Sequence, residues 1–448
     1  MTDLSNIVIE SPLGQFEIPS ESISELVKHC VTETENEYNL KHKNIFNFFG
    51  DIKPDNEYHA IRSNEVGAYL KCLMNVLDEE YEIINMTDYA TKADYEIPVS
   101  YHEFEVGPNE KESLPLKANI FVKHKESEIK YVFSLLPYHD TDGPQLEIEV
   151  FFDSTVTSFR QFWDKVENYF NTNGPLMKQR FNTQWKYVNY EQRTWDSIVM
   201  LDEMKEVLGR NITNFIKHLD EYRKNGLPTS RGILITGPPG TGKTLCCETI
   251  MSIVDCTSIY VTGDSVDSVG DIKRVYEVAR RLSPTIVIIE DIDTLGGLDR
   301  RERGSHPLLN EFLNCLNGMG RNEGVITIAT TNYPDHLDAA LSDRPGRFDV
   351  RLDFGLPDKK IRKHILNKYI GEIECAGKLN IHKIVNETDG LSGAYLREII
   401  MTAYMISLEQ EKKLNQDILE MAVGIVLNTK KQVKESYGFK APSEELYS

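Results

Sequence analysis

Residues 237–244 read Gly-Pro-Pro-Gly-Thr-Gly-Lys-Thr, and the fold of the surrounding region follows from this stretch. It matches the phosphate-binding pattern G-x-x-x-x-G-K-[ST] at every fixed position. Its glycines allow a tight turn that brings backbone N–H groups close to an anion. The apolar run 233–235 before it is typical of a buried strand, and residues 245–250 begin a helix whose N-terminus favours bound phosphate. The stretch therefore predicts a nucleoside triphosphate ligand.

The pattern also predicts what individual residues of this loop do. Lys243 is placed to reach the outer phosphates, and the Thr244 hydroxyl is placed to bind Mg²⁺. A chance glycine-rich turn is the alternative, and the strand and helix on either side argue against it. The other expected ligand contacts come from the loop and the first helical turn: Gly237, Pro238, Pro239, Gly240, Thr241, Gly242 and Leu245.

A pair of acidic residues follows the apolar run 285–289, which is typical of a buried parallel strand. Glu290 and Asp291 stand at the end of this strand, where open α/β sheets bind ligands. We expect Glu290 to hold Mg²⁺ through water, and Asp291 to orient or deprotonate an attacking water. An acidic strand-to-loop turn is the alternative, and the phosphate loop upstream argues against it.

Two further candidates lie downstream of the acidic pair. Asn332 ends the apolar strand expected at 325–330, and a carboxamide there can hydrogen-bond a γ-phosphate or a water. Arg344 and Arg347 flank a Pro-Gly turn and can stabilise charge on a transferring phosphoryl group. Each motif alone is weak, because Asn332 and the Arg-Pro-Gly-Arg segment are also typical of ordinary turns.

Taken in order, five motifs resemble the AAA family of ATPases over roughly residues 194–430: GPPGTGKT, IVIIEDID, ATTN, LDAALSDRPGRFD and TDGLSGAYL. The resemblance implies an α/β fold, in which a P-loop NTPase αβα sandwich (the AAA large subdomain) is followed by a C-terminal helical lid. It also implies assembly of the chain with itself as a ring, most commonly a hexamer, with ATP between the subunits.

The same resemblance assigns roles to residues of this chain. It identifies Asn332 as the sensor of the γ-phosphate, and Arg344 and Arg347 as arginine fingers offered to the neighbouring subunit. It places Gly393 and Ala394 where the lid approaches the nucleotide. The contacts of Lys243 and Thr244 with phosphate and Mg²⁺ agree with those expected from the loop itself.

Two departures from the usual AAA sequence indicate a subgroup of the family. The family usually has Asp then Glu after the strand that corresponds to 285–289, whereas here Glu290 precedes Asp291. That order is found in the AAA chaperone that moves the folded Rieske iron–sulfur protein across the mitochondrial inner membrane. Segments 222–228 and 308–318 also look like that subgroup, so the chain resembles a soluble relative of it. Region 262–270 lacks the bulky aromatic with which unfoldases grip a peptide, which favours remodelling of a folded partner over threading.

The chain is expected to form three parts. Residues 1–188 look like a separate α+β domain that binds the client, with a helix capped by Ser20 and further helices at 66–77 and 158–170. Its strands are expected near 7–9, 95–99, 118–122, 131–135 and 146–152. Residues 189–355 alternate strands and helices, as in a parallel sheet covered by helices, with strands expected at 233–236, 258–262, 285–289 and 325–330. Residues 356–448 are mostly helical, with a short tail.

Composition excludes several classes of protein. The 448 residues are 40% hydrophobic and 27% charged, which is ordinary for a soluble globular protein. The net charge of −20, without a long Lys/Arg run, argues against nucleic acid as a partner. No apolar run approaches the roughly 20 residues of a membrane span, and the N-terminus lacks the features of a signal peptide. Seven scattered cysteines predict reduced thiols and a cytoplasmic or other reducing compartment.

Together these features predict a Mg²⁺-dependent ATP hydrolase that works as a ring and remodels or translocates a protein partner. Two alternatives stay open. The reversed acidic pair favours an ATP-dependent assembly scaffold with negligible hydrolysis. Arg300, Arg301 and Arg303 offer a small basic loop that would suit a nucleic-acid motor or loader, but the net charge opposes this reading and a solvated charge cluster is the more usual explanation of such a loop.

Overall fold

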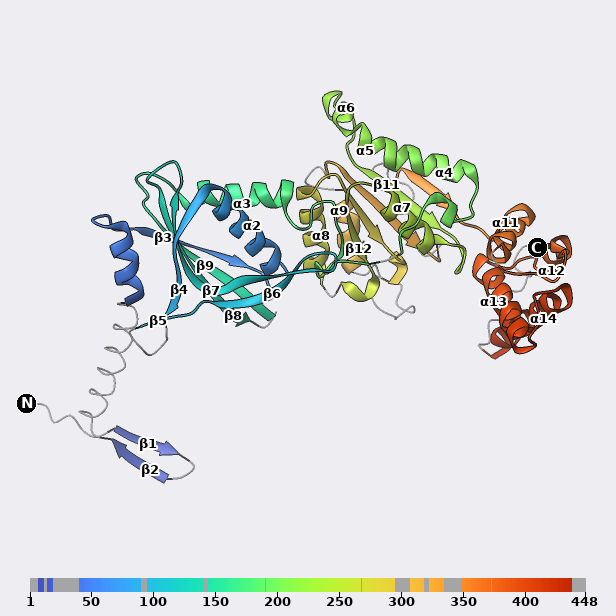
Figure 1. Ribbon diagram of the computed structural model, residues 1–448, viewed down its shortest axis with the longest axis horizontal. Helices are drawn as coiled ribbons and strands as arrows, with labels where there is room; N and C mark the ends of the chain where they lie inside the picture. The colour runs from blue at the N-terminus through green and yellow to red at the C-terminus, as the bar shows by residue number, and fades with distance from the viewer. Residues whose placement is uncertain are drawn as a thin grey trace, which may run out of the picture. The chain divides into compact units, whose positions relative to one another are not determined.

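The computed structural model describes residues 7–11, 14–18, 40–89, 95–140, 143–189, 191–266, 268–294, 307–317, 322–333, 348–371 and 373–436. The helix expected after Ser20 lies outside these ranges. The chain divides into two compact units, Met1–Met177 and Lys178–Ser448, and each is described by itself (Figure 1). This division precedes the boundary expected at 188, because the short strand β10 (Arg180–Asn182) pairs with β12 (Thr257–Val261) of the second unit.

The first unit is built on a seven-stranded antiparallel sheet, in the order β3-β9-β8-β7-β4-β5 with β6 paired to β7. A separate hairpin, β1 (Ile7–Ser11) and β2 (Gly14–Ile18), precedes it. The strands of the sheet are β3 (Asp55–Ile61), β4 (Tyr81–Tyr89), β5 (Glu96–Ile97), β6 (Ser100–Gly107), β7 (Glu110–His124), β8 (Lys130–Asp140) and β9 (Gly143–Phe152).

Alternation along the strands places helices on both faces of this sheet. Tyr131 and Phe133 of β8 pack against Phe162 of α3 (Phe159–Asn173), which lies beside α2 (Val66–Glu80). The intervening Val132 faces the other way and packs with Ile45 of the helical segment 40–49. Successive side chains of a strand point to opposite faces, so β8 contacts the helices on both faces of the sheet.

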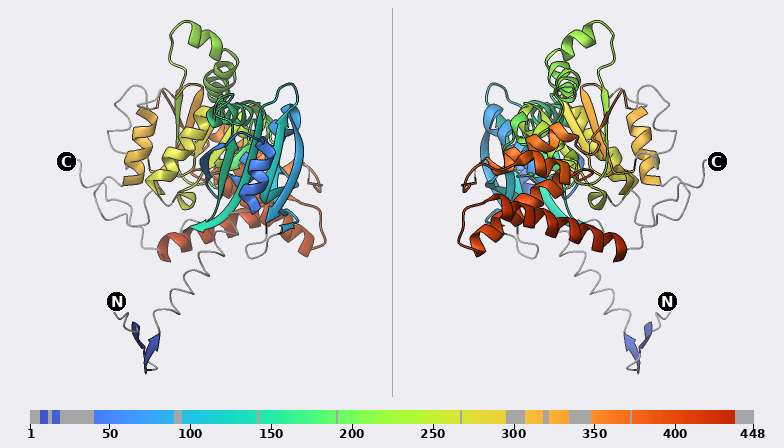
Figure 2. Two further views of the ribbon diagram at one scale, coloured as in Figure 1. Left: turned by 90° about the vertical axis from the view of Figure 1, so that its left-hand side faces the viewer. Right: turned by 90° about the vertical axis from the view of Figure 1, so that its right-hand side faces the viewer.

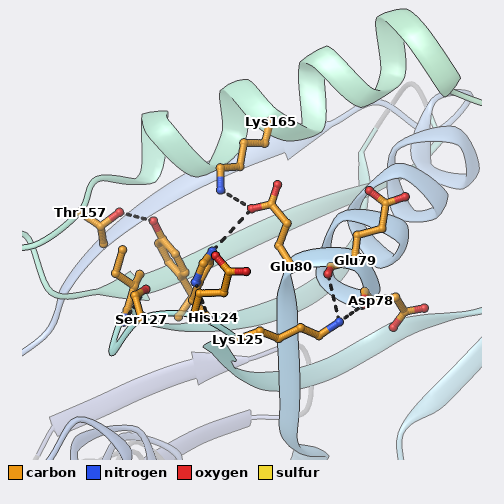
Figure 3. A network of polar contacts seen from close by, with 11 residues as sticks. Asp78, Glu79, Glu80, His124, Lys125, Ser127, Thr157 and Lys165 are labelled. Carbon is orange, nitrogen blue, oxygen red and sulfur yellow. Dashed lines mark hydrogen bonds and ion pairs between the residues drawn. The ribbon is translucent and has the colours of Figure 1, made fainter.

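The C-terminal end of α2 is held by side chains from the end of β7, from the turn after it and from α3 (Figure 3). Lys125 Nζ donates to the carbonyl oxygens of Asp78 and Glu79 at 2.6 and 3.0 Å, which satisfies acceptors that a helix end leaves unpaired. Glu80 forms an ion pair with Lys165 and lies 3.9 Å from His124 Nε2. These contacts fasten the helical layer to the sheet.

The second unit contains a six-stranded parallel sheet in the order β10-β12-β13-β14-β11-β15. Besides β10 and β12, its strands are β11 (Arg231–Thr236), β13 (Thr285–Ile289), β14 (Val325–Thr331) and β15 (Val350–Asp353). Every residue of β13 and β14 is buried, as expected for parallel strands covered on both faces. The four strands expected from sequence are confirmed as β11 to β14.

Helices cover both faces of this parallel sheet. On one face, Ile233, Ile288 and Ile328 pack with Ile250 of α7 (Lys243–Ile253) and with α4 (Asp202–Gly209) through Leu208. On the other face, the Tyr276 hydroxyl of α8 (Val269–Arg281) forms a 3.0 Å hydrogen bond with the Thr327 hydroxyl of β14, and its ring lies 6.2 Å from that of Phe312 in α9 (Pro307–Asn317). Short helices α5 (Phe215–Lys217) and α6 (Leu219–Lys224) follow α4.

A helical subdomain follows the sheet (Figure 2, right). It comprises α11 (Lys359–Ile370), α12 (Ile381–Glu387), α13 (Gly393–Glu409) and α14 (Gln416–Ser436) around a common apolar core. The expected α/β sandwich with a helical lid and an α+β N-terminal region is therefore confirmed. Within the described ranges, none of the helices combines the length and the apolar character that crossing a membrane requires.

Candidate active site

The phosphate-binding loop connects β11 to α7, and the lid packs against it. Gly237 has a φ of +148° and Gly240 a φ of +75°. A Cβ at 237 would lie 2.2 Å from the carbonyl oxygen of Phe354, and one at 240 would lie 2.8 Å from the Ala394 Cβ. The Ala394 N–H donates to the Gly240 carbonyl oxygen at 3.0 Å. Glycine is thus required at both positions for backbone geometry and for the close approach of the lid.

Lys243 lies at the start of α7 with its ammonium group surrounded by oxygen atoms. Its Nζ donates to the carbonyl oxygens of Gly237 and Pro238 at 2.8 and 3.1 Å, and to Asn332 Oδ1 at 2.6 Å. The residue is only 6% exposed. Burial lowers the pKa of Lys243, while the carboxylates of Asp291, Asp293 and Glu290 oppose this shift. The three acceptors match the three donors of an ammonium group.

Glu290 continues the sheet beyond β13, and its two carboxylate oxygens have different surroundings. Its N–H donates to the Val261 carbonyl oxygen at 2.9 Å. Oε2 accepts a short hydrogen bond from the Tyr260 hydroxyl. Oε1 is buried and has no hydrogen-bond partner within the described ranges. A buried acceptor without a donor is costly, so this oxygen is a candidate ligand for a cation.

Asp291 turns the chain sharply after Glu290, with a φ of +44°. Its N–H donates to Thr330 Oγ1 and its Oδ1 accepts from Asn332 Nδ2, both at 2.9 Å. Burial raises the pKa of Asp291, and the charges of Asp293 and Glu290 raise it further, against Lys243 and the Asn332 hydrogen bond. The left-handed backbone is uncommon for a residue other than glycine and is typical of functional sites.

Asn332 links the lysine to the acidic residue. Its amide oxygen accepts from Lys243 and its amide nitrogen donates to Asp291, so both ends of the carboxamide are used. Asp291 and Asn332 directly follow β13 and β14, and Lys243 begins α7 after the loop that follows β11, the next strand of the sheet. A chain of hydrogen bonds therefore runs from the phosphate-binding loop to the acidic pair.

The residues present fit a nucleotide-bound Mg²⁺ ion. Mg²⁺ takes oxygen ligands and is usually bound by one or two protein groups together with substrate phosphates. The buried Oε1 of Glu290 and the exposed Thr244 hydroxyl supply such a set. No group of three His, Cys, Asp or Glu side chains in the described part of the chain is arranged to hold a metal by itself.

A pocket of about 230 Å³ lies beside the phosphate-binding loop, with Thr241 in its lining. One wall is formed by Met200 and Met204, another by the linker 353–358, and a third by Ile361 and other lid residues. Sequence analysis did not identify this pocket apart from Thr241 and Gly393, because its walls come from three distant, mostly apolar segments without a motif. Its apolar lining is suited to a flat ring system.

The structure brings most of the expected site residues into one region. Lys243, Glu290, Asp291 and Asn332 are linked by hydrogen bonds or charge, and the lid residues Gly393 and Ala394 lie against Gly240. Arg344 and Arg347 lie outside the described residues. Tyr260, which bonds Glu290, was not among the expected residues; the only local signal was its position in an apolar strand.

Comparison with known proteins agrees with this geometry. The model of the ATPase family associated with various cellular activities (AAA) matches residues 233–356, which contain the loop, the acidic pair and Asn332. Residues 233–356 form an AAA ATPase domain. Such a domain takes ATP with Mg²⁺, and the oxygen ligands and the lysine described above fit both.

The AAA domain has many curated relatives. The chain is 32% identical over 236 residues to the ATP-dependent zinc metalloprotease FtsH of Acaryochloris marina, covering 49% of this chain and 35% of that protein. It is 33% identical over 256 residues to FtsH of Ruminiclostridium cellulolyticum (53% and 40%), and 31% identical over 245 residues to mouse YME1L1 (51% and 34%). The chain thus spans about a third to two fifths of the length of these relatives.

Proposed function

We propose that this chain hydrolyses ATP at the site between β11, β13 and β14, and uses the hydrolysis to remodel a protein partner. The hydrogen-bond chain from Lys243 through Asn332 to Asp291 is the single observation that supports this most strongly. It connects a group suited to bind the γ-phosphate with a carboxylate suited to accept a proton from water. A site that only bound nucleotide would need the first group alone.

Each residue has a distinct part in the proposed reaction. The loop N–H groups and Lys243 bind the β- and γ-phosphates, releasing Lys243 from its carbonyl acceptors. Thr244 and Glu290 hold Mg²⁺, which neutralises phosphate charge when bound. Asp291 orients the attacking water and accepts its proton, and its raised pKa brings it closer to the range in which a general base is effective. The Asn332 carboxamide fixes the Asp291 carboxylate and contacts the γ-phosphate.

The pocket of about 230 Å³ is proposed as the site of the nucleobase. It adjoins Thr241 of the phosphate-binding loop, so a nucleotide can occupy both at once. Because its walls include Met204, the linker 353–358 and Ile361 of the lid, a bound base would hold the lid against the sheet domain. Binding and release of nucleotide would then change how the lid is held, which is the motion the proposed remodelling requires.

Assembly as a ring, with a hexamer expected, completes the proposal. Arg344 and Arg347 are proposed to act on the nucleotide of a neighbouring subunit, and an arginine finger accelerates phosphoryl transfer by roughly 10³ to 10⁵. Residues 1–188 are proposed to bind the client. The order Glu290-Asp291 supports a relation to the AAA chaperone of the Rieske protein, whereas the relatives found are FtsH and YME1L1.

The metalloprotease activity in the names of these relatives is not extended to this chain. The sequence contains no His-Glu-x-x-His pattern, which supplies two zinc ligands and a general base on one helix. The assembly scaffold is the second candidate, because Asp291 is one methylene shorter than the glutamate usual at its position. The arginines that favour a nucleic-acid motor lie outside the described residues.

Steady-state phosphate release by the full chain tests the proposal. We expect Mg²⁺-dependent release that Lys243→Ala reduces by more than 100-fold together with nucleotide affinity, since the lysine is the main cation facing the phosphates. Lys217→Ala, at the end of α5 and outside the site, is the matched control. Tight ATP binding with no phosphate release under any condition would favour the scaffold instead.

A further inference from the structure

Tyr260 reaches from one strand of the parallel sheet to the acidic pair at the end of the next. It lies in β12, where it is paired in register with Ile288 of β13. Its hydroxyl donates to Glu290 Oε2, two residues beyond that partner. Neither the loop motif nor the acidic motif includes this tyrosine, because its connection to Glu290 depends on the pairing of two strands.

The surroundings of Tyr260 keep its hydroxyl a hydrogen-bond donor. The ring is half-buried and packs against the apolar cluster beneath α7. A phenol hydroxyl has one hydrogen to donate, and the pairing of β12 with β13 places this one against the Glu290 carboxylate.

This contact makes the two oxygens of Glu290 unequal. Oε2 is occupied by Tyr260, while Oε1 is buried and has no partner within the described ranges. A glutamate has one more rotatable bond than an aspartate, so its carboxylate needs an anchor to occupy one position. Tyr260 supplies that anchor and leaves a single oxygen available.

We propose that Tyr260 is a positioning residue for the cation site, fixing Glu290 so that Oε1 alone serves the nucleotide's Mg²⁺. The inference rests on the proposed function, because it requires a site that binds nucleotide with Mg²⁺. On this proposal, the hydrogen bond from Tyr260 compensates for the longer side chain of Glu290, which stands where the AAA family usually has aspartate.

The test is Mg²⁺ titration of a fluorescent ADP analogue bound to full-length Tyr260→Phe. The phenylalanine keeps the packed ring, and thermal unfolding checks that the fold is retained. Affinity in EDTA should match that of the unaltered chain, whereas the Mg²⁺ concentration for half-maximal effect should rise about five- to tenfold, which lies within the net effect of losing one hydrogen bond. At saturating Mg²⁺, KM for ATP should be unchanged.

Two further variants separate positioning from a general structural effect. Tyr276→Phe also removes a buried tyrosine hydroxyl bonded to the sheet, but its partner is Thr327 and not the acidic pair, so this variant should leave the Mg²⁺ midpoint unchanged. In a Glu290→Asp background the shorter carboxylate withdraws from Tyr260, so adding Tyr260→Phe should shift the midpoint by less than twofold. An equal shift in both backgrounds would overturn the inference.

The outcomes distinguish this inference from the proposed function. If Mg²⁺ strengthens nucleotide binding to the unaltered chain, and a folded Tyr260→Phe protein has the same Mg²⁺ midpoint, the role of Tyr260 is overturned and the ATPase proposal stands. An unaltered chain that binds no nucleotide, with or without Mg²⁺, would overturn both.

Discussion

At the scale of single residues, Asp291 occupies the most constrained position in the site. Its left-handed backbone, its hydrogen bond from Asn332 and its two acidic neighbours all act on one carboxylate. Holding a residue in this region costs about 1–3 kcal/mol, which the surrounding contacts must offset. The strain therefore supports a functional rather than a structural role for the side chain.

The raised pKa of Asp291 gives a prediction about pH. Turnover needs the ionised carboxylate, so it should fall as pH drops through a pKa above that of an ordinary aspartate. Asp293→Asn removes a negative neighbour, which makes ionisation of Asp291 easier and lowers its pKa. The acidic limb of the kcat profile should move to lower pH in this variant, measured by phosphate release at constant ionic strength. A limb that stays in place would contradict the electrostatic coupling.

The sequence predicted the residues of the site that belong to local motifs. Lys243, Glu290, Asp291 and Asn332 each follow an apolar strand, and carboxyl ends of parallel strands meet at one edge. Tyr260 and the pocket walls were not predicted, because their roles depend on strand register and on contacts between distant segments. No local pattern records such contacts.

At the scale of elements, α11 holds two walls of the pocket. Lys368 Nζ donates to the carbonyl oxygens of Asp196, at 2.6 Å, and Ser197, which precede the wall formed by Met200. The buried Arg362 donates to the carbonyl oxygens of Pro357, in the linker wall, and of Val385 in α12. One helix therefore ties the lid to both sides of the proposed nucleobase site.

Replacing the exposed Lys368 tests this role of α11. Lys368→Met should raise KM for ATP by roughly three- to tenfold with little change in kcat, because it loosens a pocket wall without touching the phosphates. Lys360→Met, exposed on the same helix, is the control. kcat and KM are measured separately for both variants. A loss confined to kcat would contradict the role of Lys368 in supporting the pocket wall.

Strands differed in how well the sequence predicted them. β11 to β14 are apolar runs buried on both faces, so composition alone marks them. β3 is an edge strand with mostly exposed residues, and β7 begins with the polar, mostly exposed residues 110–113 followed closely by Pro115, so neither shows a clear apolar pattern along its length. β10 and β15 are too short for a periodic signal.

At the scale of the whole molecule, the proposed activity depends on neighbouring subunits. Arg347→Ala subunits would keep an intact phosphate loop, and Lys243→Ala subunits would keep the arginine. Mixing the two should restore part of the activity that each lacks alone, because some interfaces then combine an intact loop with an intact arginine. Phosphate release across mixing ratios, with mixed rings verified by native mass spectrometry, measures this; no recovery at any ratio would argue against action in trans.

The proposed hydrolysis of ATP by this AAA domain depends on Asp291, so Asp291→Asn is the decisive variant. Asparagine keeps the size of the side chain and an acceptor for Asn332, but it cannot take a proton from water. ATP affinity and steady-state phosphate release are measured on the same preparation, with the exposed Asp220→Asn as control. We predict affinity within a few-fold of the unaltered chain and phosphate release reduced by about 10²–10⁴. Undiminished phosphate release by a folded Asp291→Asn protein would show that Asp291 does not activate the attacking water.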